Sequence, residues 1–334
     1  MLIEWGNVKR VLVVRLRSIG DTVLATPSLV VLKRFLPEAQ IDILLEDWVA
    51  PLLENFEAVD NILILKKGDL KSRLKLFVQI RRAGYDMVFN FHGGSTAGFF
   101  VRASSAKYRI GYDFYRYKRF HTHLFSAEDC INFWQTKNIH SAEQQLALLG
   151  SIGIPVKDKP KSRLFVNKKF KINDSKFALL HPVAAFDTKQ WATENFARVA
   201  EFLFGKGFNI VAVATEKERE VLEHLQKLSN VPIKIFYDLT LPEITALASQ
   251  AEIFVGNDSG IAHIAAAVNT PGVVIFGSSD RELWQPWTDA PNEIVFEELP
   301  CQPCAGYFCK EFAEPECIKR VSVESVKKAI EKVL

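Results

Sequence analysis

The stretch VGNDSGIAHIAAA, residues 255–267, decides the fold of the chain's second half. An apolar segment ends in glycine and polar residues, and a run of small apolar side chains follows. This order is typical of a buried strand that leads into a helix of a parallel sheet. The unpaired amides and positive dipole end of that helix suit an anion, so we expect a phosphate cradle at Ser259.

Simpler interpretations of this stretch exist. Asp258 or Ser259 could only cap the helix, and a lone histidine on an apolar helix is usually a core residue. His263, however, lies one turn after the run Asn-Asp-Ser-Gly, and this combination favours a functional role for it.

The same alternation of short apolar runs and helix-period segments extends over both halves of the chain. In the first half we expect strands at 10–16, 41–46, 61–65 and 85–91 and helices at 22–35, 49–56 and 70–83. In the second we expect strands at 177–181, 208–214, 233–237, 252–255 and 273–276 and helices at 194–205, 217–228, 241–250 and 261–268. The pattern predicts two doubly wound α/β domains joined by a linker within 153–176.

Length and composition agree with two domains. The chain has 334 residues, of which 48% are hydrophobic and 24% charged, and this excludes a disordered or fibrous protein. Its apolar runs are too short to span a membrane, and residues 1–14 lack the features of a secretory signal. We therefore expect a cytoplasmic protein.

The small net charge of +3 hides a polarity, because residues 1–150 carry +5 and residues 151–334 carry −2. The basic excess is densest at 102–119, where lysines and arginines alternate with tyrosines. A solvated basic face and a site for an acidic substrate remain equally open interpretations.

Three further charged residues follow predicted strands, where doubly wound sheets bind ligands. Asp21 follows Gly20 at the start of the first helix, where it could also be a cap. Lys189 precedes a helix of the second half and could meet a diphosphate as a point charge. Glu218 lies in a first helical turn, where a surface acid that complements the dipole is the simpler interpretation.

Several familiar motifs are absent from the sequence. It has no G-x-x-x-x-G-K-[ST], no G-x-G-x-x-G after either domain's first strand, and no Asp-x-Asp. A P-loop ATPase and a Rossmann dehydrogenase are therefore disfavoured, and a metal-bridged nucleotide site lacks its obvious ligands.

Three segments together resemble the ADP-heptose:lipopolysaccharide heptosyltransferases, glycosyltransferase family 9. They are the opening RLRSIGDT at 15–22 with Pro27, the segment from His181-Pro182 to TKQW at 188–191, and GNDSGIAH at 256–263. They occur in the family's order, so the resemblance covers essentially the whole chain.

The resemblance implies a GT-B fold, with an acceptor domain at 1–155, a nucleotide-sugar domain at 156–318, and a C-terminal helix at 319–334 that returns to the first domain. It implies an inverting, metal-independent enzyme that transfers heptose from ADP-heptose to a lipopolysaccharide inner-core acceptor, either Kdo or heptose on lipid A. No cofactor is then required for catalysis, and no nucleic acid is a partner. The resemblance assigns these roles: Asp21 as catalytic base, Lys189 on the donor phosphates and catalytic, Glu218 on the ribose, Leu239 at the adenine, and Asp258, Ser259, Gly260 and His263 on the ADP.

An acidic glycolipid acceptor would explain the basic first half, and it predicts a peripheral position at the inner-membrane surface. The candidate acceptor residues are Arg17, Ser18, Gly20, Arg109, Arg116 and Arg119. Some positions depart from the family pattern, since Val183, Ala184 and Ala185 follow His-Pro, and Ala214-Thr215 replaces a Gly-Gly turn. An epimerase of the same fold, a different donor sugar, a protein acceptor and a non-catalytic binding protein therefore remain alternatives.

Four of the five cysteines form a cluster after the last predicted strand: Cys301, Cys304, Cys309 and Cys317. In a cytoplasmic protein such a cluster favours a structural zinc or iron site over disulfides. Its spacing is irregular, so disulfides and free thiols remain open.

Overall fold

The computed structural model describes residues 3–167, 169–172, 176–304 and 306–334. The chain divides into two compact units, Met1–Phe165 and Val166–Leu334. The expected linker at 153–176 contains this boundary, which lies ten residues beyond the predicted one at 155.

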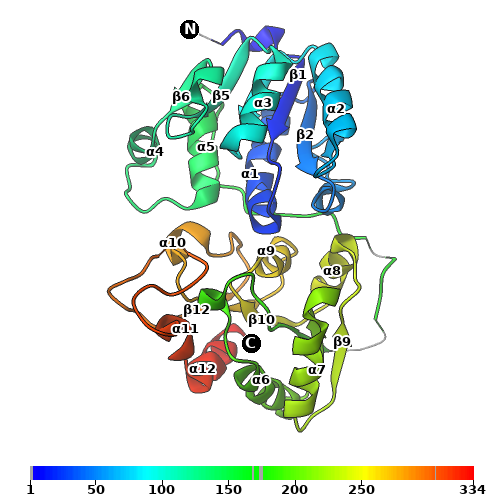
Figure 1. The fold of residues 1–334 in the computed structure, drawn as a ribbon, viewed down its shortest axis with the longest axis vertical. Helices are drawn as coiled ribbons and strands as arrows, with labels where there is room; N and C mark the ends of the chain where they lie inside the picture. The colour runs from blue at the N-terminus through cyan, green and yellow to red at the C-terminus, as the bar shows by residue number, and fades with distance from the viewer. Residues whose placement is uncertain (1–2, 168, 173–175, 305) are drawn as a thin grey trace. The chain divides into compact units, whose positions relative to one another are not determined.

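In the first unit, the described strands form a parallel sheet in the order β3-β2-β1-β4-β5-β6. Figure 1 labels β1, β2, β5 and β6 of this sheet. Its strands are β1 (Arg10–Val14), β2 (Gln40–Glu46), β3 (Asn61–Leu65), β4 (Met87–Asn90), β5 (Tyr108–Tyr112) and β6 (His123–Phe125). Its helices are α1 (Ile19–Phe35), α2 (Leu70–Ala83), α3 (Gly94–Ser104), α4 (Ala127–Trp134) and α5 (Ser141–Ser151), with short 3-10 turns η1 (Trp5–Asn7), η2 (Ala50–Leu53) and η3 (Lys118–Phe120).

The core of this unit explains the order of its strands. In β1, Leu12 and Val14 are fully buried and pack in one cluster with Phe100 and Val101 of α3. A strand that is apolar on both faces belongs at the centre of a parallel sheet, and β1 indeed pairs with both β2 and β4. The carboxyl ends of β1 to β4 therefore meet at one edge.

In the second unit, the described strands form a parallel sheet in the order β12-β11-β10-β7-β8-β9. Its strands are β7 (Phe177–His181), β8 (Asn209–Val213), β9 (Ile233–Phe236), β10 (Ile253–Asn257), β11 (Gly272–Ile275) and β12 (Asn292–Val295). Its helices are α6 (Thr193–Gly205), α7 (Arg219–Leu228), α8 (Leu241–Ala248), α9 (Gly260–Ala267), α10 (Arg281–Trp284), α11 (Glu316–Lys319) and α12 (Val323–Val333), with 3-10 turns η4 (Asp187–Lys189) and η5 (Glu216–Glu218).

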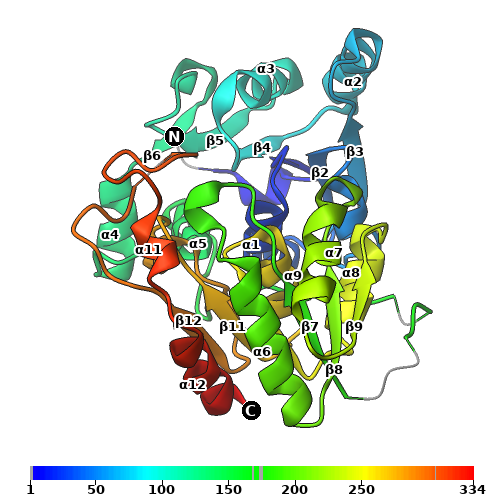
Figure 2. The ribbon, with the colours of Figure 1, turned by 60° about the horizontal axis from the view of Figure 1, so that its bottom comes forward.

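The C-terminal helix α12 (Val323–Val333) packs within the second unit, and its expected return to the first domain stays a prediction. Figure 2 shows α12 beside α6, and it also contacts β11 and β12. Its apolar face, made by Val326, Ala329, Ile330 and Val333, is buried in the core of the second unit. The face that a return to the first domain would bury is thus already covered within the second unit.

In the described part of the chain, no helix combines the length and the apolar character that crossing a membrane requires.

Candidate active site

Asp21 lies in the first turn of α1, directly beyond the carboxyl end of β1. Its Oδ2 accepts a hydrogen bond from the Ser18 hydroxyl at 2.8 Å, and its Oδ1 forms an ion pair with buried Arg15. Arg15 in turn donates to the carbonyl of Phe91 after β4. Ser18 is therefore the N-cap of α1, and Asp21 is the third helical residue of its capping box, so the interpretation of Asp21 as the N-cap itself is wrong. About a quarter of the Asp21 side chain (27%) stays exposed.

His92, which sequence reasoning missed, lies beside this carboxylate group after β4. Its Nδ1 donates to the carbonyl of Arg17 at 3.2 Å. Burial, reinforced by the positive charges of Arg15 and Arg17, lowers the pKa of His92 to about 4, so its ring is neutral at neutral pH. The signal in the sequence was the polar run His-Gly-Gly-Ser that follows the strand predicted at 85–91.

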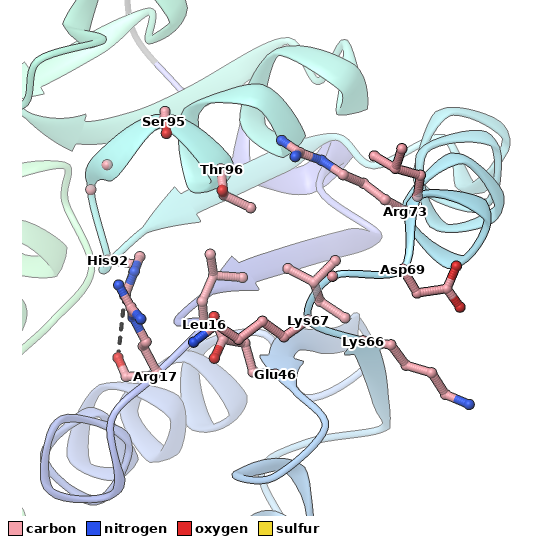
Figure 3. Close-up of a pocket in the computed structure, with 15 residues that line it drawn as sticks. Leu16, Arg17, Glu46, Lys66, Lys67, Asp69, Arg73, His92, Ser95 and Thr96 are labelled. Carbon is pink, nitrogen blue, oxygen red and sulfur yellow. Dashed lines mark hydrogen bonds between the residues drawn. The ribbon is translucent and has the colours of Figure 1, made fainter.

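A pocket of about 400 Å³ opens at this edge of the first sheet, between the loop 66–69 and the start of α3 (Figure 3). Figure 3 shows Lys67 reaching toward Leu16, Arg73 pointing from α2 toward Thr96, and Lys66 pointing away from them. Arg17 and His92 lie on the opposite side of the pocket from Arg73.

The pocket carries excess positive charge. Its lining contains four cations, Arg17, Lys66, Lys67 and Arg73, but two carboxylates only. Glu46 accepts from the Trp48 indole at 2.8 Å, and Asp69 caps α2 through the Ser72 amide at 3.0 Å. Among the residues that the structure describes, no carboxylate lies within 4 Å of any of the four cations. The pocket therefore suits an anionic ligand.

Of the predicted acceptor residues, Arg17 alone lines this pocket. Arg109 instead holds its own loop, because its guanidinium donates to the carbonyls of Phe120 at 2.7 Å and Ala106 at 2.5 Å. Arg116 and Arg119 are exposed beside the rings of Tyr117 and Phe120. Ser18 and Gly20 belong to the capped first turn of α1. An acceptor role for these five residues stays a prediction.

In the second unit, the predicted donor residues Lys189, Asp258 and Ser259 converge at the carboxyl edge of the sheet. Lys189 Nζ lies 2.7 Å from the carboxylate of Asp258, which is buried and also accepts from the Ser279 hydroxyl at 2.6 Å. Ser259 occupies the N-cap of α9, and its hydroxyl lies 3.0 Å from Nδ1 of His181. This edge thus combines a fixed ammonium group with a helix N-terminus.

Four other predicted donor residues lie on neighbouring elements. Gly260 begins α9, and His263 is buried one turn further along it. Glu218 follows β8, where its carboxylate accepts from the Thr215 hydroxyl at 2.7 Å and from the Thr215 amide at 3.0 Å. Leu239 is half-buried after β9. Asn257 was not predicted as a site residue. Its Oδ1 accepts from the Trp191 amide at 3.2 Å, while its buried side-chain nitrogen Nδ2 has no partner among the described residues.

Residues next to the cysteines pack against the loop 186–189, which carries Lys189. The Thr188 hydroxyl donates to the Gly306 carbonyl at 3.3 Å, and Tyr307 packs edge-on against Phe186 with ring centroids 4.5 Å apart. The Cys304 amide donates to the Ser278 carbonyl at 3.0 Å. The segment therefore supports η4, which carries Lys189.

All four cysteines line one cavity of about 90 Å³. Burial and the neighbouring thiols raise the pKa values of Cys304 and Cys317. Within the described ranges, no three His, Cys, Asp or Glu side chains stand together as metal ligands do. A structural zinc or iron site therefore stays a prediction, and metal analysis of protein purified under reducing conditions tests it, since absence of stoichiometric metal would contradict it.

Comparisons with known proteins identify the class. Residues 73–313 match the model of glycosyltransferase family 9 (heptosyltransferase), which is more than half of the chain. The chain belongs to this family and is a glycosyltransferase.

Its relatives include named heptosyltransferases. Lipopolysaccharide heptosyltransferase 3 of Escherichia coli is 27% identical over 84% of this chain and 86% of its own length. Lipooligosaccharide heptosyltransferase 2 of Campylobacter jejuni is 26% identical over 92% and 93%. Both comparisons extend over nearly full length, so the family relation covers both units.

Solved structures confirm the predicted GT-B fold. The E. coli ADP-heptose lps heptosyltransferase II superposes with a TM-score of 0.80, at 17% identity, over 97% of this chain and 98% of that one. The E. coli heptosyltransferase WaaC with ADP superposes with a TM-score of 0.77, at 17% identity, over 97% and 100%.

Proposed function

We propose that this glycosyltransferase moves heptose from ADP-heptose to an inner-core acceptor of lipopolysaccharide, with inversion at the sugar carbon and without a catalytic metal. The observation that carries the donor side is the Lys189–Asp258 pair next to the N-terminus of α9. The family relation and the heptosyltransferases named above, one of them solved with ADP, support the sugar and the nucleotide.

The donor diphosphate would lie against α9. Free amides at the start of this helix and its positive dipole end favour an anion, and Lys189 adds a full charge. Asp258 would repel a phosphate, so its role here is to hold Lys189 rather than to touch the donor. Positive groups fixed before the reaction stabilise the charge that develops on departing ADP.

The nucleoside would extend toward the ends of β8 and β9. One oxygen of Glu218 already accepts from Thr215, which leaves the other oxygen for a ribose hydroxyl. Leu239 follows β9 and would be the apolar contact for adenine.

In the transfer step, Asp21 would accept the proton of the acceptor hydroxyl. The hydroxyl oxygen then forms a bond to the anomeric carbon, while the bond from this carbon to the diphosphate oxygen breaks. Its electron pair leaves with ADP. Attack opposite the leaving group inverts the configuration, and no metal or redox partner is needed for balance.

The acceptor would lie at the pocket of the first unit, beside Asp21. Its uncompensated cations, among them Lys67 and Arg73, suit the carboxylates or phosphates of an acidic glycolipid core. Exposed Phe114 and Leu124, near the exposed Arg116 and Arg119 in sequence, further support contact with an anionic membrane surface. Sedimentation with anionic vesicles tests this contact, and protein that stays in the supernatant would contradict it.

Thermal shift with ADP, UDP and GDP tests the donor assignment. A ligand that binds the folded state raises the melting temperature by mass action. We expect the largest rise with ADP, without added metal. A larger rise with UDP or GDP would contradict an ADP-sugar donor.

A further inference from the structure

Ser259 is a helix N-cap residue that does not cap its helix. Its backbone is extended, with φ −150° and ψ 167°, as capping requires, yet its side chain makes no bond to the α9 amides. Among the described α-helices, every other one with Ser, Thr, Asp or Asn at this position has either a capping bond or a capping box. A neighbouring group must therefore hold the Ser259 hydroxyl away from the α9 amides.

That feature is His181. Its Nδ1 lies 3.0 Å from the Ser259 hydroxyl oxygen, and the ring is 7% exposed. Burial lowers the pKa of His181 to about 4, against an opposing effect of Glu218, so the ring is neutral and keeps one nitrogen able to accept. A neutral, immobile imidazole can therefore hold the hydroxyl in one orientation.

The sheet brings these two residues together. His181 ends β7 and stands in register with Gly256 of the neighbouring strand β10. A Cβ atom on Gly256 would lie 3.0 Å from the His181 carbonyl oxygen and 3.1 Å from its Cβ, which is tighter than ordinary contact. Glycine at 256 thus permits the close approach, and the turn after it delivers Ser259 to the imidazole.

The consequence concerns the amides of α9. A serine that caps would place its oxygen on the amide of Ile261 or Ala262, and an incoming phosphate would have to displace it. With the hydroxyl held by His181, those amides stay open beside Lys189, whose ammonium group is itself fixed by Asp258.

We propose that His181 is a positioning residue that holds the Ser259 hydroxyl off the N-terminus of α9 and so keeps its first amides open for the donor diphosphate. The inference rests on the proposed donor site. It assigns to His181 a role that acts through Ser259, without contact between the imidazole and the donor.

A double-mutant cycle tests this role through the Kd of ADP, with inorganic pyrophosphate as a second probe that lacks the nucleoside. We expect His181→Leu to weaken binding five- to tenfold when Ser259 is present, because the released hydroxyl caps the helix. In the Ser259→Ala background, we expect the same His181→Leu change to weaken binding less than twofold. His181→Asn, which can still accept near the Nδ1 position, should restore most of the affinity lost in His181→Leu, and donor KM should follow the Kd while kcat changes little.

Ser259→Asn is a second test that does not depend on whether the His181→Leu variant folds. Asparagine is among the strongest caps and leaves the buried histidine in place, so we expect it to weaken ADP at least fivefold. If His181→Leu weakened ADP binding equally in both backgrounds, or if Ser259→Asn bound ADP as tightly as wild type, the positioning role of His181 would be wrong. The proposed donor site would not be affected by either result. Wild-type protein that fails to bind ADP would instead contradict the proposed donor.

Discussion

In the proposed reaction, Asp21 has both a structural and a chemical role. It completes the capping box of α1 and pairs with Arg15, while 27% of its side chain stays exposed. We expect Asp21→Asn to lower kcat by about a hundredfold or more, because general base catalysis contributes that much, with little change in the Kd of ADP.

Ser18→Ala is the matched control for this variant. It removes the hydroxyl of the same capping box and leaves the carboxylate in place. We expect it to cost about 1 kcal/mol of stability and to retain kcat, while loss of the predicted acceptor contact at Ser18 would raise only the acceptor KM. If Asp21→Asn retained its kcat, or if Ser18→Ala lowered kcat equally, Asp21 would not be the base.

Substitutions of Lys67 and Arg73 test the proposed acceptor site independently of the proposed donor site. Figure 3 shows both reaching into the pocket of the first unit. We expect Lys67→Ala and Arg73→Ala each to raise the KM for an acidic acceptor about fivefold to tenfold, as loss of one charge-assisted contact does, with the Kd of ADP unchanged.

The control is Lys66→Ala, since this side chain points away from the other cations in the same pocket. Its effect on acceptor KM should be the smallest of the three. Three equal effects would indicate a diffuse electrostatic field instead of a defined anion site.

Burial of neutral His181 has a consequence for stability. The unfolded chain takes up a proton below 6.5, the ordinary pKa of histidine, whereas the folded protein does so near 4. The unfolded state binds more protons between these values, so stability is complete above pH 6.5 and falls as the pH decreases toward 4. At pH 5 this residue should cost about 2 kcal/mol relative to pH 8.

Urea unfolding of wild-type protein and His181→Asn at pH 8 and pH 5 measures this contribution. The variant should lose less stability on acidification than the wild-type protein. Parallel losses in the two proteins would show that His181 is not the group responsible.

Motifs in the sequence predicted which residues lie together at the proposed donor site far better than which residues line the proposed acceptor pocket. Lys189, Asp258 and Ser259 lie in two short segments, and each segment is a strand end that leads toward a helix. The pocket of the first unit instead combines residues after β1, β2, β3 and β4, and only the strand order makes them neighbours. Lys67 belongs to no motif, and the polar run after the predicted strand at 85–91 indicates that His92 lies at a strand end but not which residues are its neighbours.

Among the elements, Cys304, Gly306 and Tyr307 support the loop 186–189 that carries Lys189. Tyr307 is 65% exposed, but its ring packs against Phe186, whose own ring lies 5.5 Å from the Lys189 ammonium. We expect Tyr307→Ala to raise the Kd of ADP about threefold to fivefold, as loss of about 1 kcal/mol of aromatic packing would, with little change in melting temperature.

Phe308→Ala is the control, because Phe308 is 72% exposed and has no described ring partner. It should leave ADP affinity within twofold of wild type. Equal effects of the two substitutions would exclude a specific support of Lys189 by Tyr307.

Long apolar or amphipathic elements were predictable from the sequence, and short edge elements were not. The strands at 61–65 and 177–181 and the helix at 70–83 have the predicted bounds. β6 is an edge strand of three residues with one buried side chain, so it has no periodicity to detect. The predicted helix at 49–56 is only the 3-10 turn η2, because the backbone leaves the helical region at Glu54, with ψ 131°, and at Asn55, with φ 60°.

For the whole molecule, the sequence predicted two doubly wound domains and the GT-B fold, and the structure and comparisons confirm both. The position of α12 was not predictable in the same way, because an amphipathic helix shows which face is apolar but not which core receives it. The polarity of +5 against −2 agrees with an acidic acceptor on the first unit, where the positively charged pocket lies.

The most direct test of the proposed heptosyl transfer is an assay with ADP-heptose in the presence of a chelator, run with one core acceptor that ends in Kdo and one that ends in heptose. We predict that mass spectrometry shows one of the two acceptors gaining a single heptosyl unit, with one ADP released per unit, and that Lys189→Ala abolishes this gain. Release of ADP or isomerised sugar without a gain in mass of either acceptor would refute the proposed transfer.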